Sequence, residues 1–433
     1  MNRLLDFVKE LSFVRIGGTA EEKKAAEMIV REVNQAAKEA GRSDIQGTFM
    51  PFSIPSANVK RCLVKAAGRE LFCAPLLCSG NIDRDCKLLY LDNASEIDFS
   101  GIGDLSDTAV LLNGLTDEDV YKRLIEHKAA AFLVIQGKWY ASPEETGIYP
   151  RVLREHFTRH GVIPGFYIMA ADATALIQEE VETIHLTLEQ ENQELGSQNV
   201  LAVIEGTDLK EDSIVLTAHY DSVPLGTGSW DNATGTTALL AIYRHFVANP
   251  PRRTLRFIWC GSEELGLLGS KAYVKENKEL LEKISFCFNF DMCGTALGAN
   301  DIFITGNKEL ETFVDQYCKL TGYSAKTRAC VHSSDSAPFC DHNIPALGIS
   351  RGTSTAEIHT IHDLLPTLSE KAIQKNVAFA VRIIGDVANA AVLPVKKEMP
   401  EERRKELDKY FHREKKEDEK KEGQKEEQKA EGK

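Results

Sequence analysis

The 433-residue sequence has no apolar stretch that approaches the roughly 20 residues of a membrane-spanning helix. Residues 1–18 also lack the continuous apolar core of a secretory signal peptide. Charged residues interrupt the apolar runs there, among them Arg3, Asp6, Lys9 and Glu10. We therefore expect a cytoplasmic protein that is neither exported nor inserted in a membrane.

Closely spaced cysteine pairs are missing as well. The ten cysteines include no C-x-x-C motif, so neither a zinc ribbon nor a dithiol redox centre is indicated. In a cytoplasmic protein these cysteines are expected to stay reduced and to pack as small apolar side chains.

Positive charge is in short supply. The chain has 52 Lys+Arg against 65 Asp+Glu, a net charge of −13, and the excess of acid lies before Pro394. Non-specific nucleic-acid binding depends on lysine and arginine contacts to phosphates, so we expect no nucleic-acid partner. Metal ions or cationic groups suit such a protein better.

The last 40 residues, 394–433, contain 27 charged side chains and very few apolar ones. Such a segment cannot bury enough apolar surface to offset the entropy of ordering, so a mostly disordered tail is predicted. The alternative is a short docked helix, because Leu407, Tyr410 and Phe411 have helical spacing.

Strand and helix patterns alternate from residue 196 to residue 393. This alternation is typical of an α/β fold with a mixed, mostly parallel sheet between two layers of helices. A further helix is predicted over about 20–40, where Thr19 and Glu22 have the spacing of a capping box. Residues 51–195 read instead as short strands with one helix near 117–128.

Imidazole and carboxylate groups follow three of the predicted strands. His219 and Asp221 follow one apolar run, Glu263 and Glu264 follow the next, and Asp291 follows a third. Asp231 precedes a predicted helix, and His359 and His362 come much later in the chain. Ligands of open α/β sheets bind beyond the carboxyl ends of the strands, so these side chains are expected to meet there.

This collection favours a metal site. Crowded carboxylates repel one another unless cations neutralise them. Imidazole and carboxylate without thiolate suit zinc, with cobalt or manganese as possible substitutes. The donors exceed the needs of one ion, whereas two ions bridged by one carboxylate would use five ligands. One glutamate of the Glu263–Glu264 pair would then bind metal while its neighbour acts as a base.

Each motif also has an ordinary interpretation. A strand-end Asp291 is commonly a cap, and Glu263–Glu264 suits a helix N-terminus. His245, His332 and His342 are interpreted as structural. The other candidates each lie at the end of a predicted strand or loop within one α/β pattern, and this shared placement favours the metal site over these alternatives.

These stretches resemble metallopeptidase family 28, the cocatalytic di-zinc aminopeptidases. The matching motifs are GGTAEEKKAAEMI, SQNVLAVIEG, TAHYDSV, SWDNATGTTALL, GSEELGLLGS, NFDMCG, SSDSAPF and IHTIHD. The resemblance implies the three-layer zinc-peptidase fold and two zinc ions per chain. It implies five metal ligands: His219, Asp231, Glu264, Asp291 and His359.

The resemblance also implies a role for each of these residues. His219 and Asp291 would bind one ion, Glu264 and His359 the other, and Asp231 would bridge them. Glu263 would be the general base, with Asp221 orienting His219 through its second ring nitrogen.

Further residues follow from the same motifs. The pattern H-T-x-x-D selects His359 over His362 and makes Asp363 the closing acid. A cis peptide bond is expected between Asp231 and Asn232.

The strand-rich middle resembles a protease-associated (PA) domain. The resemblance thus implies a peptidase domain of residues 1–50 and 196–393, with the smaller PA-like domain of 51–195 inserted into it. In relatives such a module borders the active-site cleft. The alternative is a stabilising appendage that makes no contact with the substrate.

The function implied is removal of the amino-terminal residue from peptides with a free N-terminus. Glu263 would accept a proton from a water activated by the two zinc ions. The alternatives are a carboxypeptidase of the same family, with Arg328 or Arg351 holding the substrate carboxylate, a single-zinc glutaminyl cyclase relative, and a non-catalytic binding protein. The oligomeric state is left open.

Overall fold

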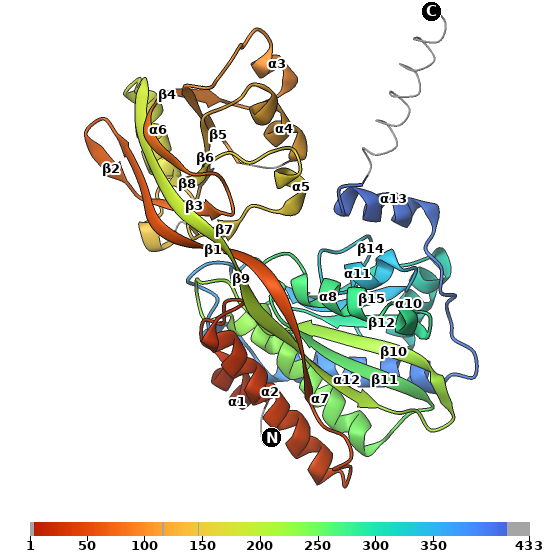
Figure 1. The fold of residues 1–433 in the computed structure, drawn as a ribbon. Coiled ribbons are helices and arrows are strands. Elements are labelled where there is room, and N and C mark those ends of the chain that lie inside the picture. The colour runs from red at the N-terminus through yellow and green to blue at the C-terminus, as the bar shows by residue number, and fades with distance from the viewer. Residues whose placement is uncertain (1–3, 115–116, 146, 414–433) are drawn as a thin grey trace, which may run out of the picture. The chain divides into compact units, whose positions relative to one another are not determined.

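The computed structural model describes residues 4–114, 117–145 and 147–413, and the chain forms two compact units (Figure 1). Unit 1 combines Met1–Phe52 with Ser197–Lys433, and unit 2 is Ser53–Gly196. Two long strands contribute residues to both units: β1 (Thr48–Ala66) and β9 (Thr183–Ile204). The division between the units therefore falls inside continuous strands.

A mixed, mostly parallel sheet forms the centre of unit 1, in the order β14-β13-β15-β12-β10-β11-β9. Besides β9, its strands are β10 (Leu209–His219), β11 (Arg253–Cys260), β12 (Ile284–Phe290), β13 (Ala299–Thr305), β14 (Lys326–Ala329) and β15 (Ala346–Gly352). The central strand β10 is parallel to both its neighbours, β11 and β12. The strands β9 and β13 run antiparallel to β11 and β15. The predicted α/β fold is confirmed.

Helices cover both faces of this sheet because its strands are apolar on both sides. Ile214 and Leu216 of β10 pack in one core cluster, and Val215 between them packs in another. The first cluster includes residues of α1 (Leu4–Leu11), α2 (Ala20–Glu39), α7 (Gly235–Ala248), α10 (Lys308–Thr321) and α12 (Glu370–Asn389). The second includes residues of α8 (Leu268–Glu276), α9 (Lys278–Leu281), α11 (Ala337–Asp341) and α13 (Glu401–Tyr410).

Unit 2 contains its own sheet, in the order β9-β4-β5-β6-β8-β3-β7. The strands are β3 (Cys73–Leu77), β4 (Ile82–Leu91), β5 (Thr108–Leu112), β6 (Ala131–Gln136), β7 (Arg151–Val152), β8 (Gly165–Met169) and part of β9, while β1 pairs with β2 (Arg69–Leu71). The predicted helix near 117–128 is α4 (Glu118–Glu126).

The prediction of a single helix in this unit is wrong. The structure also contains α6 (Ala170–Gln178) and the short helices α3 (Glu96–Phe99) and α5 (Glu155–Thr158). The α6 segment is rich in alanine, the residue with the highest helix propensity, and this local preference decides its conformation.

The prediction of a disordered tail is wrong for its first part. Residues 401–410 form α13, and Leu407 on this helix is completely buried. The Leu407 side chain anchors this charged segment in the core, so the alternative prediction of a short docked helix is the correct one here. Residues 414–433 lie outside the described residues.

The cysteines behave as predicted. All ten lie in the described ranges and are free, and six of them are buried. Among the described residues, no helix combines the length and apolar character that a membrane span requires.

Candidate active site

The central strands of unit 1 bring the predicted site residues together. His219 is the last residue of β10, Glu263 and Glu264 follow β11, and Asp291 directly follows β12. Because these strands are parallel neighbours, their carboxyl ends meet at one edge of the sheet.

Two further side chains come from connections between elements. Asp231 lies in the turn Ser229–Thr234, directly before α7, and His359 lies in the loop that follows β15. The peptide bond between Asp231 and Asn232 is cis, as the resemblance implied.

The potential metal ligands form two groups that share Asp231. In the first group, His219 Nε2 is 3.1 Å from Asp231 Oδ1 and 3.5 Å from Asp291 Oδ1. In the second, His359 Nε2 is 3.1 Å from Asp231 Oδ2 and 3.1 Å from Glu264 Oε2. The ligand atoms within each group lie within 4.8 Å of one another. Each carboxylate oxygen of Asp231 therefore serves a different group.

The chemistry of these groups fits cations. Two buried oxygens, Glu264 Oε1 and Asp291 Oδ1, have no hydrogen-bond partner among the described residues. Burial, together with the charge of Asp231, raises the pKa of Glu264 to about 7. Burial lowers the pKa of His359, but hydrogen bonds to Asp231 and Glu264 outweigh it and raise this pKa to about 10. The protonated imidazole of His359 carries a positive charge among these carboxylates. A divalent ion that displaces its proton would take the place of that charge.

Exposure differs between the two groups. The side chains of His219, Asp231 and Asp291 are 3%, 7% and 12% exposed, whereas that of His359 is 43% exposed. The cluster is therefore reached by solvent from the side of His359.

Glu263 lies beside the two groups rather than within either of them. Its carboxylate is within 4.8 Å of ligand atoms of His219 and Glu264. Burial raises its pKa well above the usual range; the charge of His219 opposes this rise, and the charge of Glu264 adds to it. A carboxylate with a raised pKa in such a place suits a general base.

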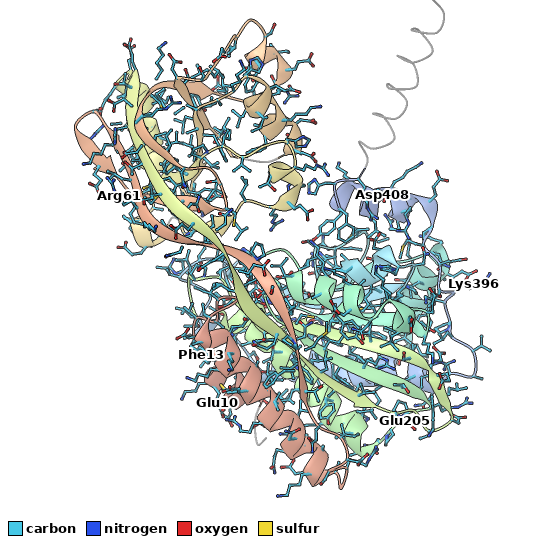
Figure 2. The ribbon with its side chains drawn as sticks, in the orientation of Figure 1. Glu10, Phe13, Arg61, Glu205, Lys396 and Asp408 are labelled. Atoms are coloured by element: carbon cyan, nitrogen blue, oxygen red, sulfur yellow. The ribbon has the colours of Figure 1, made fainter. Side chains whose placement is uncertain are left out.

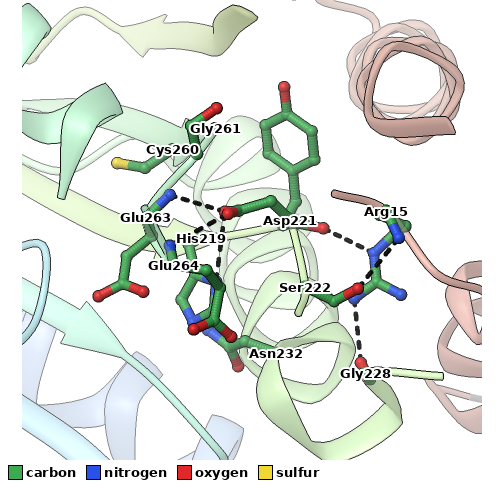
Figure 3. Close-up of polar contacts among 12 residues, drawn as sticks. Arg15, His219, Asp221, Ser222, Gly228, Asn232, Cys260, Gly261, Glu263 and Glu264 are labelled. Carbon is green, nitrogen blue, oxygen red and sulfur yellow. Dashed lines mark hydrogen bonds and ion pairs between the residues drawn. The ribbon is translucent and has the colours of Figure 1, made fainter. Parts of the chain in front are cut away.

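Asp221 positions both glutamates. Its Oδ1 accepts a 2.9 Å hydrogen bond from the Glu263 amide, and its Oδ2 accepts a 3.1 Å bond from the Glu264 amide (Figure 3). Asp221 Oδ1 is also 3.5 Å from His219 Nδ1. Asp221 belongs to neither group of ligands, so it is a positioning residue.

Asp363 positions Asp231, the ligand that the two groups share. Its carboxylate accepts hydrogen bonds of 2.7 Å from the amide of Trp230 and 3.0 Å from the amide of Asp231. His362 is exposed and belongs to neither group of ligands.

Arg15 is a positioning residue that the sequence did not reveal. Its side chain is completely buried, and its guanidinium donates to the carbonyls of Tyr220 and Thr227. It also donates to the carbonyl of Gly228 (Figure 3). Burial lowers its pKa to about 10. The Arg15 guanidinium thus links the backbone after β10 to the turn that carries Asp231.

Glu22 is a second residue of this kind. Thr19 caps α2 as predicted, accepting a 3.3 Å hydrogen bond from the Glu22 amide, but the Glu22 carboxylate does not complete a capping box with Thr19. It accepts instead from the amide of Gly18 and the hydroxyls of Ser197 and Ser262. Glu22 thereby holds the residue that precedes Glu263.

Left-handed backbone conformations occur beside the ligands. Ser262, Met292 and His359 have φ angles of 53°, 54° and 57°. Such conformations are unfavourable for residues other than glycine and cluster at functional sites, where the surrounding structure enforces them.

Asp335 is a buried carboxylate whose role the sequence did not show, although it lies in the motif SSDSAPF. It is 1% exposed, and neither of its oxygens has a hydrogen-bond partner among the described residues. Burial raises its pKa to about 6, and its charge contributes to the raised pKa of Glu263.

Glu22 leads to a prediction on stability and pH. Burial raises the pKa of this carboxyl to about 7 from its ordinary 4.5. The folded protein therefore holds a proton that the unfolded chain releases, and this group makes stability fall as pH rises from 4.5 to 7. In metal-free protein, Glu22→Gln should gain up to about 3 kcal/mol over wild type across this interval. Urea unfolding at several pH values measures the difference.

Glu21→Gln, at the exposed neighbouring position, is the control and should show no such trend. A Glu22→Gln difference that does not change with pH would contradict the assignment.

An α/β unit that gathers imidazole and carboxylate donors beyond the ends of its strands has the arrangement of a metal-dependent hydrolase. Residues 199–384 match the model of Peptidase family M28. This part of unit 1 therefore matches peptidase family M28. The identity of unit 2 as a PA domain stays a prediction.

Similar proteins extend over more of the chain. Aminopeptidase YwaD of Bacillus subtilis (strain 168) is 28% identical over 400 residues, which cover 89% of this chain and 82% of that protein. Leucine aminopeptidase 2 of Trichophyton rubrum is 31% identical over 172 residues, 37% of this chain and 34% of that protein. The structure of BSAP, a zinc aminopeptidase from Bacillus subtilis, matches 93% of this chain and 98% of its own, with a TM-score of 0.73 and 23% identity.

Proposed function

We propose that this chain is an aminopeptidase that binds two zinc ions and removes the amino-terminal residue of peptides. The observation that carries the proposal is the division of the Asp231 carboxylate between two groups of ligands. Zinc is the ion named for the similar Bacillus subtilis structure, and the donor set also suits cobalt or manganese.

The chemistry follows from the positions of the side chains. Two divalent ions held by these ligands would acidify a water and polarise the substrate carbonyl. Glu263 accepts the proton of the attacking water and passes it to the departing amine. Asp221 holds the backbone of Glu263, and Glu22 holds Ser262 before it, so the base is oriented from two sides.

Selection of a free amino terminus follows from the charge of the site. The substrate α-amino group is positively charged, and Glu263 and Asp291 provide an acidic surrounding for it. A blocked amino terminus lacks that charge and gains nothing from these carboxylates.

The carboxypeptidase alternative requires a cationic side chain to hold a substrate carboxylate. The two arginines considered for this role have partners within the protein. Arg328 pairs with Asp301 at 3.0 Å, and Arg351 donates to the carbonyl of Thr295 and the side chain of Asn300. The aminopeptidase proposal is therefore favoured.

The remaining alternatives are a single-zinc cyclase and a non-catalytic binding protein. All five ligands converge with Glu263 beside them, whereas a single-zinc site would not need both groups. This completeness supports an active two-metal site.

The substrate class is tested with purified, zinc-loaded protein. We expect release of p-nitroaniline from aminoacyl p-nitroanilides. We expect no cleavage of N-acetylated forms of the same compounds, and no release of an acidic carboxyl-terminal residue from N-acetylated peptides. The matched control is Glu263→Gln, loaded with zinc in the same way. Cleavage of the blocked compounds but not of the free ones would overturn the proposal.

A further inference from the structure

The helix α13 is the last described element of the chain. The connection from α12 passes Lys396, and Asp408 lies on α13 itself (Figure 2). Leu407 on α13 is completely buried in the core cluster that contains Phe339 and Cys340 of α11. The helix is therefore docked on unit 1 through an apolar anchor.

On one side, α13 holds the start of the segment Val331–Asn343. Glu406 Oε2 accepts a 3.0 Å hydrogen bond from the Val331 amide. The hydroxyl of Tyr410 is 2.8 Å from Ser333 Oγ. Arg403 is 6% exposed and pairs with the other oxygen of Glu406, which keeps this carboxylate turned toward the segment.

On the other side, α13 holds the end of the same segment. Arg404 donates to the carbonyl and carboxylate of Asp341, at 2.9 and 3.0 Å, and to Asn343 Oδ1 at 2.6 Å. Arg413, just after the helix, donates to the same carboxylate. Both ends of Val331–Asn343 are thus bound to α13.

Between these two points, the segment packs against the strands that carry the proposed site, because Phe339 and Cys340 lie in one core cluster with Cys260 of β11 and Cys287 of β12. Asp335 is buried, and its charge reaches Glu263. His332 stacks on Phe303 with ring centroids 3.7 Å apart, and the charge of Asp291 acts on it. The segment therefore forms part of the surroundings of Glu263 and Asp291.

We propose that α13 positions the active site: Arg404 holds the end of Val331–Asn343 while Glu406 and Tyr410 hold its start, so that Asp335 between them stays in place against the strands that carry Glu263 and Asp291. The inference rests on the proposed peptidase function. Glu406 and Tyr410 touch no metal ligand among the contacts described above, so both act through the segment.

The test removes the contacts to Val331 and Ser333 but leaves the Leu407 anchor. In Glu406→Ala/Tyr410→Phe, we expect kcat with leucine p-nitroanilide to fall about ten- to hundred-fold, because small displacements of positioned groups have effects of this size. KM and zinc content should change less than two-fold. Hydrogen exchange of the Val331 amide should become faster, since its acceptor is lost.

The matched control is Glu401→Ala/Lys405→Ala, which removes an exposed ion pair from the same helix. It should keep wild-type kcat and exchange. Glu406→Gln should restore most of the activity, because its amide oxygen can still accept from Val331.

The outcomes separate this inference from the proposed function. Wild-type protein that cleaves no aminoacyl p-nitroanilide would contradict the function, while the exchange measurement would still report on α13. Active wild type with equal kcat in the double variant and the control would overturn the inference. If the double variant unfolds, Tyr410→Phe alone is compared with the control in the same assays.

Discussion

Glu263→Gln is expected to lower kcat by about 10²–10⁴-fold, the range of a lost general base, while zinc content stays at that of the wild type. Glutamine has the shape of glutamate but cannot accept the proton of the attacking water. Glu263 lies outside the two groups that share Asp231, so its replacement should leave both of them intact. Steady-state kinetics and metal analysis of the purified protein measure the two quantities.

Glu264→Gln provides the matched comparison. Glu264 Oε2 belongs to the second ligand group, so this variant should lose zinc as well as activity. If Glu263→Gln lost zinc and Glu264→Gln kept it, the two glutamates would have exchanged roles. Full activity of zinc-loaded Glu263→Gln would exclude Glu263 as the base.

Asp231→Asn is expected to have the largest effect on metal binding. Each oxygen of this carboxylate faces a different histidine, His219 or His359, and an asparagine side chain keeps only one oxygen. We expect bound zinc to fall by at least one ion per chain and kcat/KM to fall by about 10³-fold or more, as expected when metal chemistry is lost. The increase in Tm that zinc gives the wild type should shrink accordingly.

Asp363→Asn is a graded control for this experiment. Asp363 holds the amide of Asp231 but does not enter a ligand group, so a loss of about 10–100-fold in metal affinity is expected. Unchanged zinc content in Asp231→Asn would contradict the shared-ligand arrangement.

Much of the site was predictable because its side chains lie where strands end. His219, Glu263 and Asp291 each follow an apolar run, and parallel strands bring such positions together. The roles of Glu264 and His359 needed the motif resemblance as well, since a glutamate pair or a late histidine has several ordinary interpretations. The structure then showed which oxygen of Asp231 faces which group.

Other parts of the site could not be predicted, because they depend on contacts between distant segments. Glu22 has the spacing of a capping box, yet its carboxylate meets Ser262, 240 residues away. In the sequence, Arg15 resembles an ordinary charged residue beside an apolar run. In the structure it is buried and donates to backbone carbonyls some 200 residues later in the chain. Charged residues carry no periodic signal that would indicate such partners.

By itself the sequence determined the α/β class, the helix over about 20–40 and the edge of the sheet where the ligands gather, because apolar periodicity and strand order are local properties. Only the tertiary structure decided that α13 is docked and that Arg15, Glu22 and Asp335 surround the site. Periodicity shows which face of a segment is buried, whereas the partner on that face is set by how distant segments pack.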